Sequence, residues 1–181
     1  MSKIIAVFGS TGNQGGAVLK SLLKAGNYHV RAITRNVNSD KAKKLATLNN
    51  VTVHEADFKN PESLDKVLAG SYGAFFVTDF SSHFDHSEVK QGTNLIDSAI
   101  RNNVKHVVFS GLENCEKIIN KPVYHFDYKA EIENYALARA DKLNFTSIQL
   151  SAFYQELVSS LLYKVAPQTW VCTFPMADKP L

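Results

Sequence analysis

Short apolar runs alternate along this chain with longer segments in which apolar residues recur every three or four positions. The runs have strand length and are rich in β-branched residues, whereas the longer segments have the spacing of amphipathic helices. Such alternation is typical of βαβ units, in which crossover helices join parallel strands. The pattern predicts six buried strands, at Ile4–Phe8, Val30–Thr34, Val51–His54, Ala74–Val77, His106–Phe109 and Phe145–Ile148.

Five amphipathic helices are expected between these strands. The third has the best-marked start, because Asn60 suits a helix N-cap, Pro61 suits the first helical position and Glu62 places an acid in the first turn. Together the elements predict an α/β fold with a Rossmann-type doubly wound parallel sheet. The expected helices are Gly15–Ala25, Lys41–Leu48, Pro61–Leu68, Glu88–Asn102 and His125–Ala140.

The last part of the chain departs from this alternation. Phe153–Lys164 has helical spacing and Trp170–Phe174 has the composition of a short strand, but no closing element follows them. We therefore divide the chain into a Rossmann domain at residues 1–152 and the start of a truncated C-terminal region at residues 153–181.

Composition limits the classes of function. The 181 residues are 45% hydrophobic and carry a net charge of +3 without a long basic run, so we expect neither direct nucleic-acid binding nor membrane association. The two cysteines lack metal-ligand spacing, and the stretch His83–His86 offers too few ligands, so no metal site is expected. We expect a cytoplasmic protein, small enough to enter the nucleus as well.

A glycine-rich loop joins the first predicted strand to the first predicted helix. Its GxxGxxG spacing permits a tight turn, close approach of the backbone to phosphates, and close packing of the helix on the strand. The helix N-terminus adds free N–H groups and a positive dipole end. With a strand before it and a helix after it, the loop indicates a dinucleotide site. Its residues are Gly9, Ser10, Thr11, Gly12, Asn13, Gln14 and Gly15.

The end of the second predicted strand indicates which dinucleotide binds. NAD sites place an acid there for the ribose 2′-hydroxyl, whereas this chain has Arg35 between Thr34 and Asn36. A guanidinium binds a 2′-phosphate through charge-assisted, bidentate hydrogen bonds. We therefore expect NADP(H) to be the cofactor, unless Arg35 is only a solvated loop charge.

Other residues at strand ends face the same crevice, because ligands of open α/β sheets bind beyond the carboxyl ends of the strands. Asp57 is placed to accept a hydrogen bond from the adenine amino group, and Phe58 beside it is also expected to contact the cofactor. A capping or turn role for Asp57 remains open. Thr78, Asp79 and Phe80 are expected to border the ribose and the nicotinamide.

The glycine loop, Arg35, Thr78–Phe80, Val108–Asn114 and His125–Lys129 together resemble the NmrA-like family of atypical short-chain dehydrogenase/reductases, and are most similar to animal members described as NADPH sensors. The resemblance implies a Rossmann-type fold, NADP(H) preference and a regulatory role. It also implies a C-terminal substrate region that is largely absent from this chain. By resemblance, the cofactor also contacts Lys90, Phe153, Tyr154, Gln155 and Glu156.

The parent superfamily uses a Tyr-x-x-x-Lys pair, in which the lysine helps the tyrosine to donate a proton. Here His125 stands four residues before Lys129, and Tyr124 and Tyr128 are each one residue out of register. Neutral imidazole is a poor acid, so the usual proton donor is missing. Lys129 still suits the nicotinamide ribose hydroxyls, and Ser110 falls near the superfamily's catalytic serine.

These observations favour a redox-sensing regulatory protein whose protein partner, or second copy, responds to NADP(H) occupancy. The alternative is an NADPH-dependent reductase of the quinone or isoflavone type, in which Lys129 or a water replaces the tyrosine. Catalytic activity is therefore expected to be weak or absent, with Lys129, His125 and Ser110 as the candidate catalytic residues. A scaffold that binds no cofactor is a third class.

Overall fold

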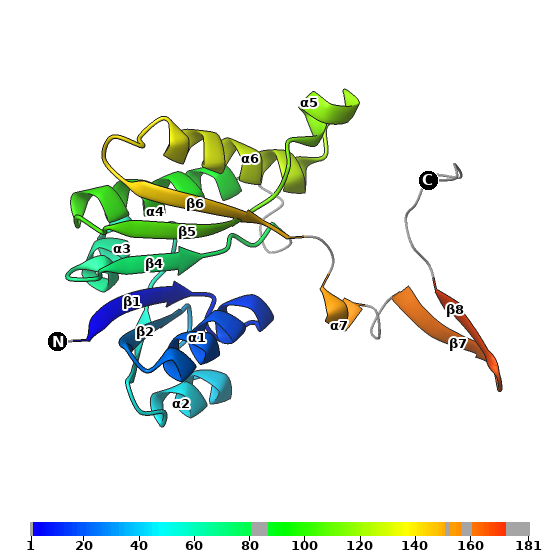
Figure 1. Cartoon of the computed structure of the whole chain (residues 1–181), viewed down its shortest axis with the longest axis horizontal. Helices are drawn as coiled ribbons and strands as arrows, with labels where there is room; N and C mark the ends of the chain where they lie inside the picture. The colour runs from blue at the N-terminus through cyan, green and yellow to red at the C-terminus, as the bar shows by residue number, and fades with distance from the viewer. Residues whose placement is uncertain (1, 81–86, 151–152, 157–160, 173–181) are drawn as a thin grey trace. The chain divides into compact units, whose positions relative to one another are not determined.

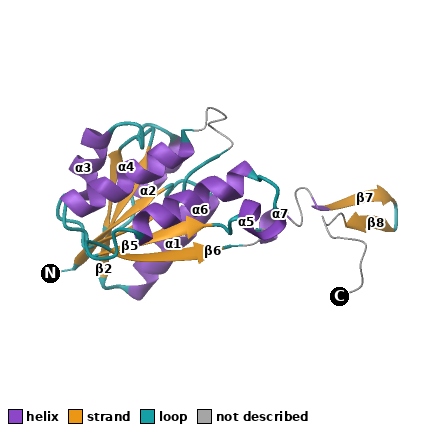
Figure 2. Ribbon diagram, turned by 90° about the horizontal axis from the view of Figure 1, so that it is seen from above, coloured by secondary structure: helices purple, strands orange, loops and turns teal. Residues whose placement is uncertain are grey.

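The structure is a computed structural model that describes residues 2–80, 87–150, 153–156 and 161–172. It divides into two compact units, Met1–Gln149 and Leu150–Leu181. The first unit contains a sheet with helices on both faces, as Figure 1 and the view from above in Figure 2 show. The second contains a short helix and a hairpin.

Six strands form the sheet in the order β3-β2-β1-β4-β5-β6, and every neighbouring pair is parallel. The order reverses between β1 and β4, which creates the crevice where open α/β sheets bind ligands. The predicted Rossmann-type doubly wound sheet and all six predicted strands are confirmed. The strands are β1 (Lys3–Phe8), β2 (Tyr28–Thr34), β3 (Val51–Glu55), β4 (Gly73–Phe76), β5 (His106–Gly111) and β6 (Asn144–Gln149).

The five predicted helices are also confirmed, within a few residues at their ends. The cap of α3 is as predicted, since the Asn60 side chain accepts a hydrogen bond from the Ser63 N–H and Pro61 begins the helix. The short α5 was not expected; the Asn114 side chain caps it by accepting from the Lys117 N–H. The helices are α1 (Asn13–Ala25), α2 (Asp40–Ala46), α3 (Pro61–Leu68), α4 (Glu88–Arg101), α5 (Cys115–Ile119) and α6 (Tyr124–Leu137).

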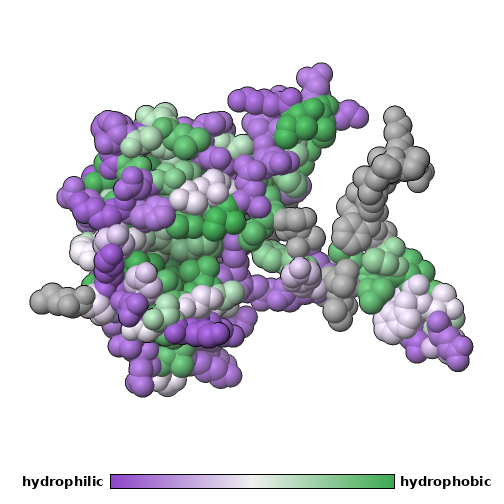
Figure 3. Space-filling model, viewed as in Figure 1, coloured by the Kyte–Doolittle hydropathy of each residue, from purple (hydrophilic) through white to green (hydrophobic). Residues whose placement is uncertain are grey.

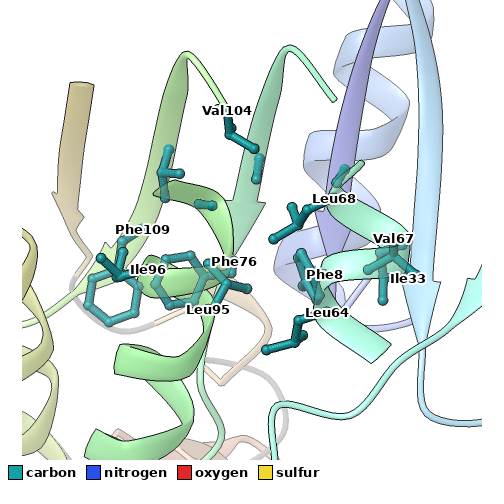
Figure 4. Packing of buried hydrophobic residues seen from close by; sticks show 14 of the residues in the cluster. Phe8, Ile33, Leu64, Val67, Leu68, Phe76, Leu95, Ile96, Val104 and Phe109 are labelled. Carbon is teal, nitrogen blue, oxygen red and sulfur yellow. The ribbon is translucent and has the colours of Figure 1, made fainter. Parts of the chain in front are cut away.

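Each face of the sheet has its own hydrophobic core. Helices α3, α4 and α6 cover one face, where the Phe76 and Phe109 rings stack with centroids 4.5 Å apart, as Figure 4 shows from close by. Helices α1 and α2 cover the other face, around Leu19 and Phe75. Helices α4 and α6 pack closely at Gly92. A Cβ added there would lie 2.5 Å from the Ile132 side chain of α6.

The second unit corrects one prediction. Helix α7 spans only Tyr154–Glu156, and β7 (Leu162–Ala166) pairs antiparallel with β8 (Thr169–Cys172). The helix predicted at Phe153–Lys164 is therefore wrong at its C-terminal end, where aromatic and β-branched residues pair with a second strand instead. The strand predicted at Trp170–Phe174 coincides with β8 as far as Cys172.

Figure 3 shows hydrophobic side chains gathered over α5, among other places on the face that it presents. Ile118 and Ile119 of this helix are 63% and 55% exposed. Among the described residues, no helix has the length and apolar character needed to cross a membrane. The histidine-rich stretch His83–His86 lies outside the described residues.

Candidate functional site

Gly9 and Gly15 bring α1 close to the end of β1. Gly9 has a φ of +66°, a left-handed conformation that favours glycine. A Cβ added at Gly15 would lie 2.3 Å from the Gly9 carbonyl oxygen and 2.7 Å from that of Phe8, which is closer than real Cβ atoms come to backbone. The loop therefore depends on glycine at both places, as its spacing predicted.

The N-terminus of α1 is open to an anion. Gly12 is the N-cap of α1 and has an extended backbone, and no side chain caps the helix. The Gly12 N–H donates to the Gly9 carbonyl at 2.9 Å and closes the turn before the helix. The first turn contains no acidic residue. Because the first N–H groups of a helix have no partners within it, these groups and the helix dipole suit a diphosphate.

Two side chains of the loop hold it in place. The Ser10 hydroxyl, in a residue only 2% exposed, donates to the Ile33 carbonyl at 3.0 Å and ties the loop to the end of β2. The Gln14 amide donates to the Ser110 hydroxyl at 2.8 Å and ties the loop to the end of β5. Ser110 is 7% exposed, and this candidate catalytic hydroxyl accepts a hydrogen bond from a residue of the glycine loop itself.

Arg35 follows β2 directly, next to the glycine loop. Strand pairing sets Phe8 beside Ile33, so Arg35 emerges one strand away from the loop at the same edge of the sheet. The side chain is exposed, and it makes no hydrogen bond or ion pair with any residue that the structure describes. Thr11 and Asn13 complete this edge: Thr11 is half-buried and Asn13 is exposed.

Asp57 follows β3 and has a turn role. Its Oδ1 accepts a hydrogen bond from the Lys59 N–H at 2.8 Å, which was the alternative that the sequence left open. The residue is exposed and lies directly after β3 and Ala56, at the end of that strand. The neighbouring Phe58 ring stacks on Phe8 at 5.2 Å, and the Phe58 carbonyl accepts from the Asn94 amide at 2.9 Å.

A buried ion pair lies where the chain leaves β4. The Lys129 ammonium donates to the Thr78 carbonyl and to the Thr78 hydroxyl, each at 2.8 Å, and to the Glu88 carboxylate. The Thr78 hydroxyl in turn donates to the same Glu88 oxygen at 2.6 Å. The side chains of Lys129 and Glu88 are 11% and 1% exposed. Lys129 therefore reaches the predicted crevice, but in contact with partners that the sequence did not indicate.

Aromatic rings lie beside this pair. The Phe80 ring contacts His125 at 5.7 Å and Tyr128 at 6.0 Å between centroids, and Tyr128 stacks on Tyr124 at 5.7 Å. His125 and Asp79 are both exposed. His125, four residues before Lys129 on α6, thus takes part in an aromatic group at the edge of the sheet.

A cavity of about 380 Å³ opens between the starts of α3 and α4. Lys90, one of the expected contacts, is exposed and lines it. The cavity adjoins Phe58, whose carbonyl bonds to its wall at Asn94. The other lining residues are Lys59, Pro61, Ser87 and Gln91, with Asn94.

Asp127 joins the starts of α5 and α6. Its carboxylate accepts from the backbone N–H groups of Glu116 at 3.0 Å and Val123 at 2.6 Å. Desolvation opposes ionisation of Asp127, but the hydrogen bonds from these groups and from the Cys115 N–H outweigh it and hold its pKa below the ordinary value. This carboxylate fixes the segment next to Lys129.

Four of the expected contacts belong to the second unit. Phe153, Tyr154 and Gln155 are exposed there, and Glu156 is half-buried. Their part in the site stays a prediction.

Glu88 is the main residue that sequence reasoning missed. It was expected only as the first residue of a helix, where an acid is common. Its partners, Thr78 and Lys129, are 10 and 41 residues away, so no local spacing connects them.

The whole chain, residues 1–181, matches the NmrA-like family. The chain belongs to this family. The NmrA-like family domain-containing oxidoreductase lnaB of Aspergillus flavus is 36% identical over 172 residues, which cover 91% of this chain and 50% of lnaB. The family interpretation drawn from the sequence is thus confirmed.

Solved structures of similar fold include a member of the same family, NmrA. NmrA, a negative transcriptional regulator solved with NAD and with NADP, is 26% identical, with a TM-score of 0.72 over 82% of this chain and 45% of NmrA. Triphenylmethane reductase of Citrobacter sp., solved with NADP(H), is 30% identical, with a TM-score of 0.69 over 85% of this chain and 51% of the reductase. The chain spans about half the length of the relatives that it matches.

Proposed function

We propose that this chain is the dinucleotide-binding part of an NADP(H)-dependent regulatory protein. The observation that carries the proposal is the first turn of α1, which has neither an acid nor a side-chain cap and follows a loop that requires glycine at Gly9 and Gly15. This loop lies at the reversal of strand order, where dinucleotides bind in doubly wound sheets. The NAD and NADP complexes of NmrA support the same ligand class.

Arg35 supports NADP(H) over NAD(H). It is exposed at the end of β2, next to the glycine loop, and Thr34 and Asn36 on either side of it are uncharged. A guanidinium at the end of β2 favours the 2′-phosphate of NADP(H). The acidic residue that would accept from the ribose 2′-hydroxyl of NAD(H) is missing from this position.

A regulatory role fits the surroundings of Lys129. All three described contacts of the ammonium are to Thr78 and Glu88, and the tyrosine position of the superfamily's pair holds His125. In this account NADP(H) orders the edge of the sheet, and a protein partner or second copy responds to the occupied state. The partner surface is expected near α5, whose Ile118 and Ile119 are exposed.

The second candidate is an NADPH-dependent reductase. It is favoured by the description of lnaB as an oxidoreductase and by triphenylmethane reductase among the structural relatives. In this chain the reaction would use Lys129 or a water in place of the missing tyrosine.

Single-turnover oxidation of NADPH by a panel of quinones separates the two candidates. The regulatory proposal predicts NADPH binding without oxidation above the rate of quinone and NADPH alone. Lys129→Met is compared with Lys142→Met, a substitution of the same kind at an exposed position. Oxidation by the wild type that Lys129→Met abolishes and Lys142→Met retains would contradict the regulatory proposal and favour the reductase.

A further inference from the structure

The buried pair of Glu88 and Lys129 holds one ammonium in one place. An ammonium has three N–H donors, and the described acceptors are three: the Thr78 carbonyl, the Thr78 hydroxyl and Glu88 Oε1. The direction of each hydrogen bond is fixed, because the Thr78 hydroxyl uses its single proton on Glu88 and can only accept from Lys129. The cluster therefore leaves the ammonium little freedom to move.

Glu88 is the anchor of this cluster. Its side chain is 1% exposed, and Oε2 is buried without a hydrogen-bond partner among the residues that the structure describes. The interactions at Oε1 alone therefore compensate a buried negative charge. A buried carboxylate is retained in a fold only when a cation or strong donors compensate it, so Glu88 and Lys129 depend on one another.

The cluster joins three elements at one point of the crevice. Thr78 lies just beyond β4, Glu88 begins α4 and Lys129 lies on α6. Strand β4 is the first strand of the half of the sheet that continues through β5 and β6, whereas Arg35 leaves the opposite half, at the end of β2. In a doubly wound sheet the two halves each hold one mononucleotide, so Lys129 belongs to the nicotinamide half and Arg35 to the adenosine half.

We propose that Glu88 is the positioning residue for Lys129, and that it fixes the ammonium for the nicotinamide mononucleotide half of the cofactor. The proposal rests on the proposed function. A ribose hydroxyl takes the place of one of the two Thr78 acceptors, while Glu88 retains the ammonium. Glu88 itself does not touch the cofactor, and its effect on binding passes through Lys129.

Two ligands separate this role from general support of the fold. NADPH occupies both halves of the crevice, whereas adenosine 2′,5′-bisphosphate contains only the adenosine half. Glu88→Asp keeps the charge but withdraws the carboxylate by one methylene, and Lys129→Met removes the ammonium. The matched control is Glu131→Asp, the same substitution at an exposed position of α6. Calorimetric titration gives both affinities for each variant of the full chain.

We expect Glu88→Asp and Lys129→Met each to weaken NADPH binding about tenfold or more, the size of one charge-assisted hydrogen bond. The Kd of adenosine 2′,5′-bisphosphate should stay within about twofold of the wild-type value, because this ligand does not reach Lys129. Glu88→Asp should cause no further loss in the Lys129→Met background, because its effect passes through Lys129. Glu131→Asp should change neither affinity.

Three results overturn the proposal: unchanged NADPH affinity in Glu88→Asp, equal losses for both ligands, or a further loss in the Lys129→Met background. If Glu88→Asp fails to fold, Glu88→Gln gives the same test, because it keeps the side-chain length and an oxygen acceptor for Lys129 and removes the charge that retains the ammonium. Wild-type protein that binds neither ligand contradicts the proposed function instead, which is a different outcome from a failure confined to the Glu88 variants.

Discussion

Substituting alanine at Gly15 tests the close approach of α1 to β1. The new Cβ would lie 2.3 Å from the Gly9 oxygen, 2.6 Å from the Gly9 carbonyl carbon and 2.7 Å from the Phe8 oxygen. Every one of these atoms belongs to the backbone, so relief requires the loop to move by about 1 Å to restore ordinary contact. Overpacking of this kind costs about 3 kcal/mol, and the better helix propensity of alanine returns about 1 kcal/mol. The net loss is about 2 kcal/mol.

Thermal and urea unfolding followed by circular dichroism measure this loss. For a chain of this length, about 2 kcal/mol lowers Tm by roughly 4–8 °C. The control is Gly16→Ala in the next position, where a Cβ would lie 3.3 Å from the Ser10 oxygen, a contact that a shift of a few tenths of an ångström relieves. We expect the stability of this control to lie within about 1 kcal/mol of the wild type, because the better helix propensity of alanine offsets the tight contact. Equal stability of the two alanine variants would refute the reasoning.

Three further predictions concern other parts of the chain. Arg35→Ala should weaken NADPH about 10- to 100-fold and leave NADH unchanged in calorimetry, since one charged contact is lost; equal losses for both would contradict the assignment. Gly92→Ala places a Cβ 2.5 Å from the Ile132 side chain and should cost about 1–3 kcal/mol in urea unfolding; an unchanged midpoint would show that α4 and α6 have room. Because the pKa of Asp127 is lowered in the folded state, its contribution is complete above its unfolded value of 3.8 and is lost as the pH falls through the folded value. Asp127→Asn should therefore be less stable than the wild type near pH 7 and equal to it near pH ~2, and a difference that persists in acid would oppose this reading.

The sheet could be predicted from the sequence because buried parallel strands are apolar on both faces and stand out as short runs. The start of α3 could also be predicted, since Asn60 and Pro61 act within the first turn of the helix. The glycine loop is a third local signal, because Gly9 and Gly15, which lie in close contact, are only six positions apart in the sequence. In each case the residues that determine the structure are close together in the sequence.

The remaining features depend on contacts between distant segments. Strand β7 forms because Leu162–Ala166 pairs with β8. The spacing of its apolar residues alone favoured a helix. The Glu88–Lys129 pair depends on the packing of α4 against α6, which a single sequence does not reveal. Ser110 was expected as a strand-end hydroxyl, but its bond from Gln14 spans 96 residues and is visible only in three dimensions.

The most direct measurement is a crystal structure of the chain grown with NADPH. We expect the diphosphate to lie against the backbone N–H groups at the start of α1 and the 2′-phosphate to lie on the Arg35 guanidinium. A dinucleotide bound away from the Gly9–Gly15 loop, or a 2′-phosphate facing solvent with Arg35 turned from it, would contradict the account.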